Sequence, residues 1–193
     1  MKTIAITGGI GSGKSAVSAL LSKRGIPVYD ADSRTKALYH GDLLDRIEAA
    51  FGRSFRLPDN RVDFAALAAV AFASEDALAR LEAIVHPAVL ADFNAWRDAL
   101  PDAPLVAIES AIILDKPLFD GSYDAVVLVY APVEECVTRV LARNPDLSED
   151  AIRRRIAAQR TDFSRADYLL INDGTLEALA PQVEALVHHL LGK

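Results

Sequence analysis

Short apolar runs and longer stretches with helical spacing alternate along this chain. The short runs are rich in aliphatic and β-branched residues and cover residues 3–7, 26–29, 105–108, 125–130 and 168–171. Each run is typical of a strand buried in a parallel sheet. Helical spacing is found at residues 15–24, after residue 133 and from 176 to 190. This alternation predicts an α/β fold with a doubly wound, mostly parallel sheet.

The first predicted helix is amphipathic. Its apolar face carries Val17, Leu20 and Leu21. We expect the opposite, solvent-facing side to carry Ser18, Ser22 and Lys23.

The pattern changes between residues 33 and 100, where strand signals vanish. Alanine-rich stretches with helical spacing cover residues 42–51, 64–73, 75–85 and 87–99. A polar turn at residues 57–60 interrupts them, and Pro87 suits the first turn of the last helix. The pattern predicts a helical insertion packed beside the sheet. His86 stands alone before Pro87, and a lone histidine at such a junction is more often structural than catalytic.

The segment from Gly8 to Ser15 reads G-x-x-x-x-G-K-S and lies between the first strand and the first helix. Its glycines allow successive backbone N–H groups to converge on one point, and the following helix adds its free amides. Lys14 is suited to the β- and γ-phosphates and Ser15 to Mg²⁺. The segment predicts a phosphate-binding loop rather than a turn capped by Ser12 or Ser15, and leaves the nucleotide and the phosphate acceptor open.

Acidic residues follow two other predicted strands. Asp30 and Asp32 come after the second strand, and Glu109 ends the third. Ligands of open α/β sheets bind at the carboxyl ends of the strands, so these acids share an edge with the phosphate loop. Each is a candidate for the Mg²⁺ shell or for substrate contact. The alternative is that one aspartate caps a helix beginning near Ser33, and that Glu109 caps the segment after it.

Arginines cluster in the last third of the chain, at positions 139, 143, 153, 154, 155, 160 and 165. Arg139 and Arg143 share one helix face, as do Arg155 and Gln159. The polar residues 144–148 break the helix, and Ser148 is the predicted N-cap of the next one. Because few acids lie nearby, we expect these arginines to lack local partners and to cover a bound phosphate. The alternative is a solvated helix face.

Composition narrows the classes of function. The chain has 193 residues, 51% of them apolar, which suits one α/β domain with small inserted parts. The formal net charge of −6 argues against a general nucleic-acid binder. The single cysteine, Cys136, allows no intrachain disulfide or cysteine metal cluster. No apolar run approaches the ~20 residues of a membrane span. We expect no signal peptide, because the first predicted strand begins at residue 3. We expect a cytoplasmic protein with neither nucleic-acid nor membrane partners.

Several motifs together resemble the dephospho-coenzyme A kinase family over essentially the whole chain. They are Gly8–Ser15, Asp30-Ala31-Asp32, His86-Pro87, Glu109-Ser110, Arg139 with Arg143, Arg155 with Gln159, and Asn172-Asp173-Gly174. The resemblance implies a fold of the P-loop kinase type. It also implies transfer of the γ-phosphate of ATP to the ribose 3′-hydroxyl of dephospho-coenzyme A, the last step of coenzyme A synthesis.

The same resemblance implies roles for individual residues. It implies three catalytic residues: Lys14, Arg139 and Asp32, of which Asp32 is the base. ATP and Mg²⁺ are expected at Gly8, Gly9, Ile10, Gly11, Ser12, Gly13, Lys14, Ser15, Ala16, Arg143 and Asn172, with Ser15 on the metal and Asn172 flanking the adenine. The acceptor is expected at Asp32, His86, Glu109 and Arg155. Residues 33–100 are the expected coenzyme A-binding insertion of a single kinase domain (residues 1–193), and residues 139–160 the lid.

This chain departs from the family pattern at two places. Ala16 stands where many members have Thr, which should be tolerated because Ser15 holds the metal-ligand position. Residues 111–115 differ from the usual Pro-Leu-Leu and Phe-Glu pattern, although Asp115 keeps the acidic end.

Other classes of function remain as alternatives. A regulatory GTPase would need an Asp-x-x-Gly switch and an Asn/Thr-Lys-x-Asp base reader, and the sequence has neither. A different P-loop kinase, for a nucleoside monophosphate or shikimate, stays open, as does a non-catalytic nucleotide-binding protein. We expect a monomer or a weak homo-oligomer.

Overall fold

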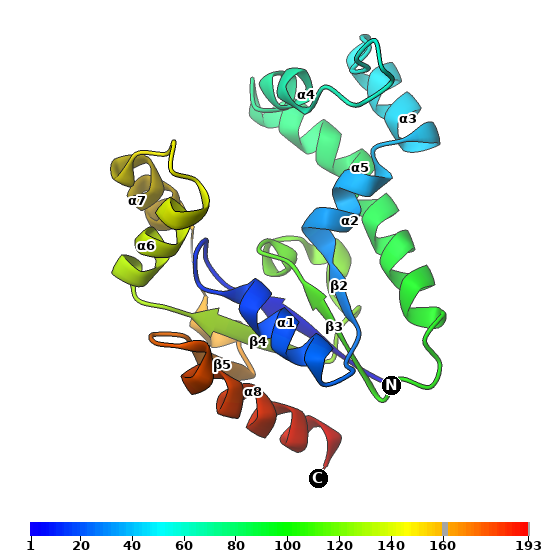
Figure 1. The fold of residues 1–193 in the computed structure, drawn as a ribbon. Coiled ribbons are helices and arrows are strands. Elements are labelled where there is room, and N and C mark those ends of the chain that lie inside the picture. The colour runs from blue at the N-terminus through cyan, green and yellow to red at the C-terminus, as the bar shows by residue number, and fades with distance from the viewer. Residues whose placement is uncertain (160–161, 193) are drawn as a thin grey trace. The chain divides into compact units, whose positions relative to one another are not determined.

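The computed structural model describes residues 1–159 and 162–192 (Figure 1). Two compact units make up the chain. One comprises Met1–Asp30 together with the chain from Leu100 onward, and the other comprises Ala31–Ala99. The first unit contains the sheet and the second is helical.

The sheet has five strands, β1 (Lys2–Thr7), β2 (Val28–Asp30), β3 (Leu105–Glu109), β4 (Ala125–Tyr130) and β5 (Tyr168–Ile171). Their order is β2-β3-β1-β4-β5, and each neighbouring pair is parallel. The prediction of an α/β fold with a mostly parallel sheet is therefore confirmed. Because all strands run the same way, their carboxyl ends meet at one edge of the sheet, where β1 leads into the glycine loop.

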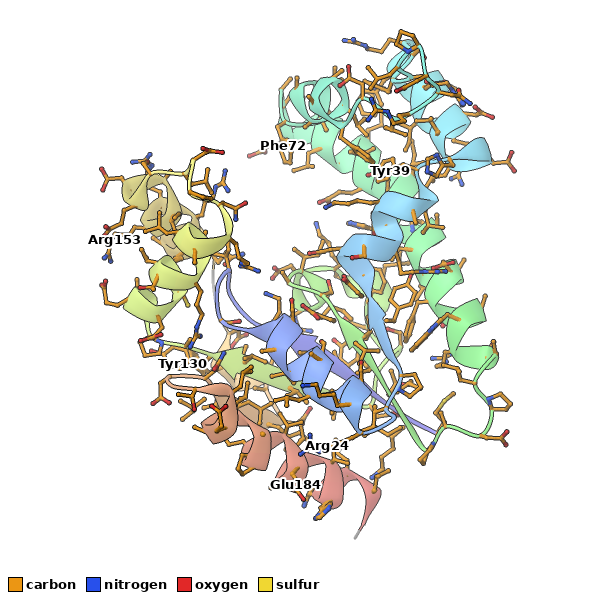
Figure 2. The ribbon with its side chains drawn as sticks, in the orientation of Figure 1. Arg24, Tyr39, Phe72, Tyr130, Arg153 and Glu184 are labelled. Carbon is orange, nitrogen blue, oxygen red and sulfur yellow. The ribbon has the colours of Figure 1, made fainter. Side chains whose placement is uncertain are left out.

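Two helices cover one face of this sheet. Figure 1 shows α1 (Lys14–Lys23) and α8 (Leu176–Leu191) lying together on that face. Their buried side chains form one apolar core with residues of the strands, among them Ile4, Ile6, Val17, Leu21, Val127, Leu170, Leu179 and Val183. An ion pair at 3.5 Å joins Arg24, the residue after α1, to Glu184 of α8 (Figure 2). Because both side chains are partly solvated, the pair adds at most about 1 kcal/mol.

The prediction of which α1 residues face the solvent is wrong at one position. Ser18 was predicted on the solvent face, but it is buried. The reason is a polar partner beneath the helix, the Glu109 carboxylate at the end of β3. A buried hydroxyl is tolerated where it is hydrogen-bonded.

A helical hairpin follows β4 and consists of α6 (Val133–Arg143) and α7 (Glu149–Ala158). Pro132 precedes α6, and the Ser148 hydroxyl caps α7 as predicted, by accepting a hydrogen bond from the Ala151 amide at 3.3 Å. The hairpin has a small core of its own, formed by Val137, Val140 and Ile152. Ile10 of the glycine loop packs against this core, so the hairpin and the loop are in direct contact.

The connection from β3 to β4 contains only two short 3₁₀ turns, Ile113–Asp115 and Pro117–Phe119. A third such turn, Phe163–Arg165, precedes β5.

The helical unit contains α2 (Ala31–Leu38), α3 (Gly41–Phe51), α4 (Phe64–Ala71) and α5 (Glu75–Asp98). The helix predicted to begin near Ser33 begins at Ala31, so Asp32 lies in its first turn. One expectation is wrong here. The two helices predicted on either side of His86-Pro87 are one helix, α5, with Pro87 inside.

The continuity of α5 has a physical reason. A proline inside a helix removes one backbone hydrogen bond and crowds the preceding turn. Val85, Val89 and Phe93 are spaced four residues apart and all are buried, which shows that one apolar stripe continues past Pro87. Burial along that stripe outweighs the local cost of the proline.

A single carboxylate organises the loop after α3. Glu48 accepts hydrogen bonds from the Phe55 amide and the Ser54 hydroxyl, each at 2.8 Å, and from Arg56 Nε at 3.2 Å. These contacts, the Phe55 amide above all, lower the pKa of Glu48. Elsewhere in the unit the buried Tyr39 ring packs edge-on against Phe64, whereas Phe72 is exposed (Figure 2).

Candidate nucleotide-binding site

The glycine loop between β1 and α1 has the backbone that a phosphate loop requires. Gly8, Gly11 and Gly13 have φ angles of +147°, +77° and +98°, which side-chain-bearing residues rarely adopt. A Cβ atom on Gly11 would also lie 2.6 Å from the Cys136 carbonyl oxygen. These positions therefore need glycine for both conformation and space.

Lys14 brings a positive charge to the mouth of this loop. Its ammonium group donates to the carbonyl oxygens of Gly8 and Gly9 at 2.9 and 3.1 Å. Lys14 also opens α1, whose first turn contains no acidic residue. A cation at the positive end of a helix dipole is unfavourable by itself, so the arrangement suits a bound anion.

A hydroxyl–carboxylate pair lies next to Lys14. The Ser15 hydroxyl donates to Oε1 of Glu109 at 3.0 Å, and the Ser18 hydroxyl donates to Oε2 at 2.6 Å. Hydroxyl and carboxylate oxygens fit Mg²⁺, which takes one or two carboxylates and completes its shell with phosphate and water. Among residues 1–159 and 162–192, no three His, Cys, Asp or Glu side chains gather as a metal site.

Asn172 closes the loop from the side of β5. Its side chain is buried, and Nδ2 donates to the Ser12 carbonyl oxygen at 2.8 Å. On α6, the Arg139 guanidinium donates to the Asn172 carbonyl at 3.0 Å and to the Gly174 carbonyl at 3.5 Å. The chain of contacts from Arg139 through Asn172 to Ser12 links the hairpin to the phosphate loop.

A cavity opens beside this chain of contacts. It brings together several of the predicted nucleotide-binding residues and is lined by Gly11, Gly13, Lys14, Ser15, Ala16, Arg139, Ala142 and Arg143. Arg143 forms no hydrogen bond or ion pair with another residue in the described part of the chain, so its charge faces the solvent at this cavity.

The expectation that the clustered arginines lack local partners is wrong for three of them. Arg153 of α7 (Figure 2) holds both carboxylate oxygens of Glu134 at 2.9 and 2.7 Å, and its Nε donates to Glu149 at 2.8 Å. Arg139 pairs with Glu135 and Arg165 with Asp120. The acids responsible include the first-turn residues of α6 and α7, which stabilise the helix N-termini as well as the arginines.

Three further arginines of the cluster, Arg154, Arg155 and Arg160, were also expected to lack local partners. Within residues 1–159 and 162–192, Arg154 and Arg155 contact no acid, and both are exposed. Arg160 lies outside the described residues. Arg155 therefore stays a candidate for an anionic ligand, whereas Arg153 serves to join α6 to α7.

Gln159 contacts the phosphate loop from the end of the hairpin. Its Oε1 accepts a hydrogen bond from the Ile10 amide at 2.6 Å. A second cavity lies where the loop meets this segment, and its lining includes Gly8, Gly9, Asp115 and Gln159. The sequence marked Gln159 only through its spacing from Arg155, and no role was expected for its side chain.

Two predicted site residues belong to the helical unit and are described within it alone. Asp32 is exposed in the first turn of α2, and His86 is half-buried in α5. Arg34 of α2 and Asp92 of α5 form a two-pronged ion pair at 2.9 and 2.7 Å, which ties the helix of Asp32 to that of His86. The sequence did not anticipate this pair.

The parallel sheet, the glycine loop with its lysine, and the hydroxyl–carboxylate pair at the same edge define a protein of the P-loop kinase class. A model of the dephospho-CoA kinase family matches residues 2–178. The dephospho-CoA kinase of Corynebacterium glutamicum is 38% identical over 202 residues, covering 100% of this chain and 99% of the relative. The chain belongs to the dephospho-CoA kinase family.

Solved structures share the fold of this chain. The crystal structure of TT1252 from Thermus thermophilus superposes with a TM-score of 0.82 at 35% identity, covering 98% of this chain and 97% of that one. The dephospho-CoA kinase from Campylobacter jejuni superposes with a TM-score of 0.74 over 100% of this chain and 98% of its own, at 18% identity, and supports the fold.

None of the helices in the described part of the chain is both long and apolar enough to span a membrane.

Proposed function

We propose that this chain transfers the γ-phosphate of ATP to the ribose 3′-hydroxyl of dephospho-coenzyme A, giving coenzyme A and ADP. The observation that carries the proposal is the phosphate loop with Lys14 and the Ser15–Glu109 pair at its mouth, in a chain that matches the dephospho-CoA kinase family along nearly all its length. Phosphoryl transfer requires mainly alignment and neutralisation of charge, and these groups supply both.

The loop from Gly8 to Ala16 binds the triphosphate through backbone amides other than that of Ile10, which donates to Gln159, and through Lys14. The nucleoside part lies in the cavity lined by Ala16, Arg139 and Arg143, where two guanidinium groups adjoin the loop. Asn172 supports this wall of the site through its hydrogen bond to Ser12 and through the carbonyl that holds Arg139.

Ser15 and Glu109 hold Mg²⁺ in this proposal. The metal supplies positive charge that offsets the charge on the phosphate oxygens. Glu109 was expected to bind the acceptor, with a metal role left open. Its 3.0 Å contact with the Ser15 hydroxyl favours the metal role.

Asp32 acts as the base. Its carboxylate accepts the proton of the 3′-hydroxyl, the oxygen forms its bond to the γ-phosphorus, and ADP leaves as the bond to the β–γ bridging oxygen breaks. His86, Arg155 and the helical unit bind the rest of the acceptor. The ion pair between Arg34 and Asp92 supports this role, because it holds the helix of Asp32 in place.

Residues 139–160 act as the lid. Closure of a lid excludes water, which would otherwise take the γ-phosphate. Arg139 places positive charge at the nucleotide, and Gln159 joins the far end of the lid to the phosphate loop. We propose a cytoplasmic enzyme that acts as a monomer or a weak homo-oligomer.

The test is an assay of ADP release with the purified protein, ATP, Mg²⁺ and a panel of acceptors. Dephospho-coenzyme A should support release, whereas adenosine monophosphate and shikimate should not. Release with either of these acceptors but not with dephospho-coenzyme A would point to a different small-molecule kinase. ATP binding without release on any acceptor would point to a non-catalytic nucleotide-binding protein.

A further inference from the structure

Ser18 is a buried polar residue of the sheet unit to which the proposed reaction gives no role. It lies on α1, one helical turn after Ser15, and its side chain is almost wholly inaccessible, with 9% of the residue's surface exposed. Its hydroxyl donates to Oε2 of Glu109 at 2.6 Å. Because residues three apart lie on the same helix face, Ser15 and Ser18 both reach the end of β3.

The two serines divide the Glu109 carboxylate between them. An ionised carboxylate only accepts hydrogen bonds, so each serine donates to a different oxygen. The Ser18 contact is the shorter and more buried of the two, whereas Ser15 is exposed at the mouth of the loop. The contact with Ser18 therefore fixes the rotation of the Glu109 carboxylate. The other oxygen, Oε1, then faces Ser15 at the mouth of the loop, where the proposed metal binds.

We propose that Ser18 is a positioning residue for the Mg²⁺ end of the nucleotide site. By anchoring one oxygen of Glu109, its hydroxyl holds the other beside the Ser15 hydroxyl, so that both metal-facing oxygens are in place before nucleotide binds. Groups that orient metal ligands in this way contribute about 10- to 100-fold to metal affinity. The proposal rests on the proposed function only in requiring that the protein binds a nucleotide with Mg²⁺.

The experiment measures binding of the non-hydrolysable β,γ-imido analogue of ATP by calorimetry, once with Mg²⁺ and once with EDTA. Ser18→Ala should weaken binding of the Mg²⁺-loaded analogue about 10- to 100-fold and leave binding in EDTA nearly unchanged. Ser18→Cys, which has similar size and a weak donor, should behave in the same way without leaving a cavity. Ser22→Ala is the matched control, because Ser22 is exposed on the same helix.

A double-mutant cycle tests whether Ser18 acts through Glu109. In the Glu109→Gln protein, Ser18→Ala should cause little further loss of Mg²⁺-dependent affinity. Unchanged affinity for the Mg²⁺-loaded analogue in both Ser18 variants would overturn the proposal. Equal losses with Mg²⁺ and with EDTA would do the same, since they would indicate a merely structural serine. Because no acceptor is present, these outcomes do not depend on which molecule the enzyme phosphorylates.

Discussion

Single hydrogen bonds from distant parts of the chain shape the phosphate loop. Asn172 of the β5 edge donates to Ser12, Glu109 of β3 accepts from Ser15, and Gln159 accepts from the Ile10 amide. Each contact fixes a loop residue in the sheet unit before any ligand binds. Such preorganisation reduces the cost of ordering the site when the nucleotide arrives.

Asp32→Asn tests the proposed base. Asparagine keeps the size of the side chain but cannot accept the proton, so kcat should fall about 10²- to 10⁴-fold while KM changes little. Steady-state kinetics with dephospho-coenzyme A measure both constants. Asp42→Asn, at another exposed first-turn acid of the helical unit, is the control and should be near wild type. A near-normal kcat for Asp32→Asn would remove Asp32 from the role.

Arg139→Ala tests the arginine at the nucleotide cavity. Arginines that stabilise the transferring phosphate contribute about 10³- to 10⁵-fold to turnover, so kcat should fall strongly while the melting temperature drops only slightly. Arg154→Ala is the control, because Arg154 is exposed and contacts no acid in the described part of the chain. A collapse of the melting temperature with Arg139→Ala would show that its bonds to the Asn172 and Gly174 carbonyls are mainly structural.

The role of a single residue could be predicted from the sequence only where the residues that define the role lie close together along the chain. The phosphate loop could be predicted because its glycine, lysine and serine spacing encodes the function directly. Ser18 could not, because helical periodicity assigns a serine to solvent and its partner Glu109 is far along the chain. The partners of Arg153 were missed for a related reason: Glu134 lies on a different helix.

Elements of the helical unit are joined by polar contacts as well as by apolar packing. Glu48 of α3 organises the loop that contains Ser54, Phe55 and Arg56. Its lowered pKa means that the folded state favours the ionised form. The resulting stability is present above the ordinary pKa of 4.5 and is lost as the pH falls through the lower pKa of the folded protein.

Glu48→Gln should therefore lower the free energy of unfolding at neutral pH by about 1.5–3 kcal/mol, the range for hydrogen bonds to charged groups. The difference from wild type should shrink as the pH falls below 4.5. Urea unfolding across this pH range measures it. A difference that stayed constant or grew toward low pH would contradict the role of the ionised carboxylate.

Gln159 tests the contact between lid and loop. Gln159→Ala removes the acceptor for the Ile10 amide, so the lid should close less completely and more ATP should be hydrolysed by water per phosphate transferred. Gln159→Glu keeps an acceptor and is the matched variant; it should bring hydrolysis back toward the wild-type ratio. Comparing ADP release with and without the acceptor gives this ratio. An unchanged ratio in Gln159→Ala would show that the contact does not gate water.

Sequence patterns predicted the strands well and helix boundaries less well. All five strands were found because buried parallel strands are continuous apolar runs. The break predicted at Pro87 was wrong because the buried stripe of Val85, Val89 and Phe93 holds α5 together across it. The rule that proline ends a helix considers only the local backbone, and it leaves out the free energy gained by burying these side chains.

At the scale of the whole molecule, the order β2-β3-β1-β4-β5 explains why the site lies where it does. The central strand β1 delivers the phosphate loop, and its neighbour β3 delivers Glu109 to the same edge. On the other side, β4 leads into the hairpin of α6 and α7, and β5 delivers Asn172. The linear motif predicted the loop, and the end of the third predicted strand placed Glu109 at the same edge. The hydrogen bonds that Asn172 and Gln159 make with the loop could not be predicted, because they depend on the order of the strands.

The most direct test of the proposed reaction is to follow the phosphate itself. The purified protein would be incubated with ATP labelled in the γ-phosphate, Mg²⁺ and dephospho-coenzyme A, and the labelled product would be identified by mass spectrometry and ³¹P NMR. We expect one labelled phosphate on the ribose 3′-oxygen for each ADP formed. Label that appears as inorganic phosphate, or at another position of the acceptor, would contradict the proposed function.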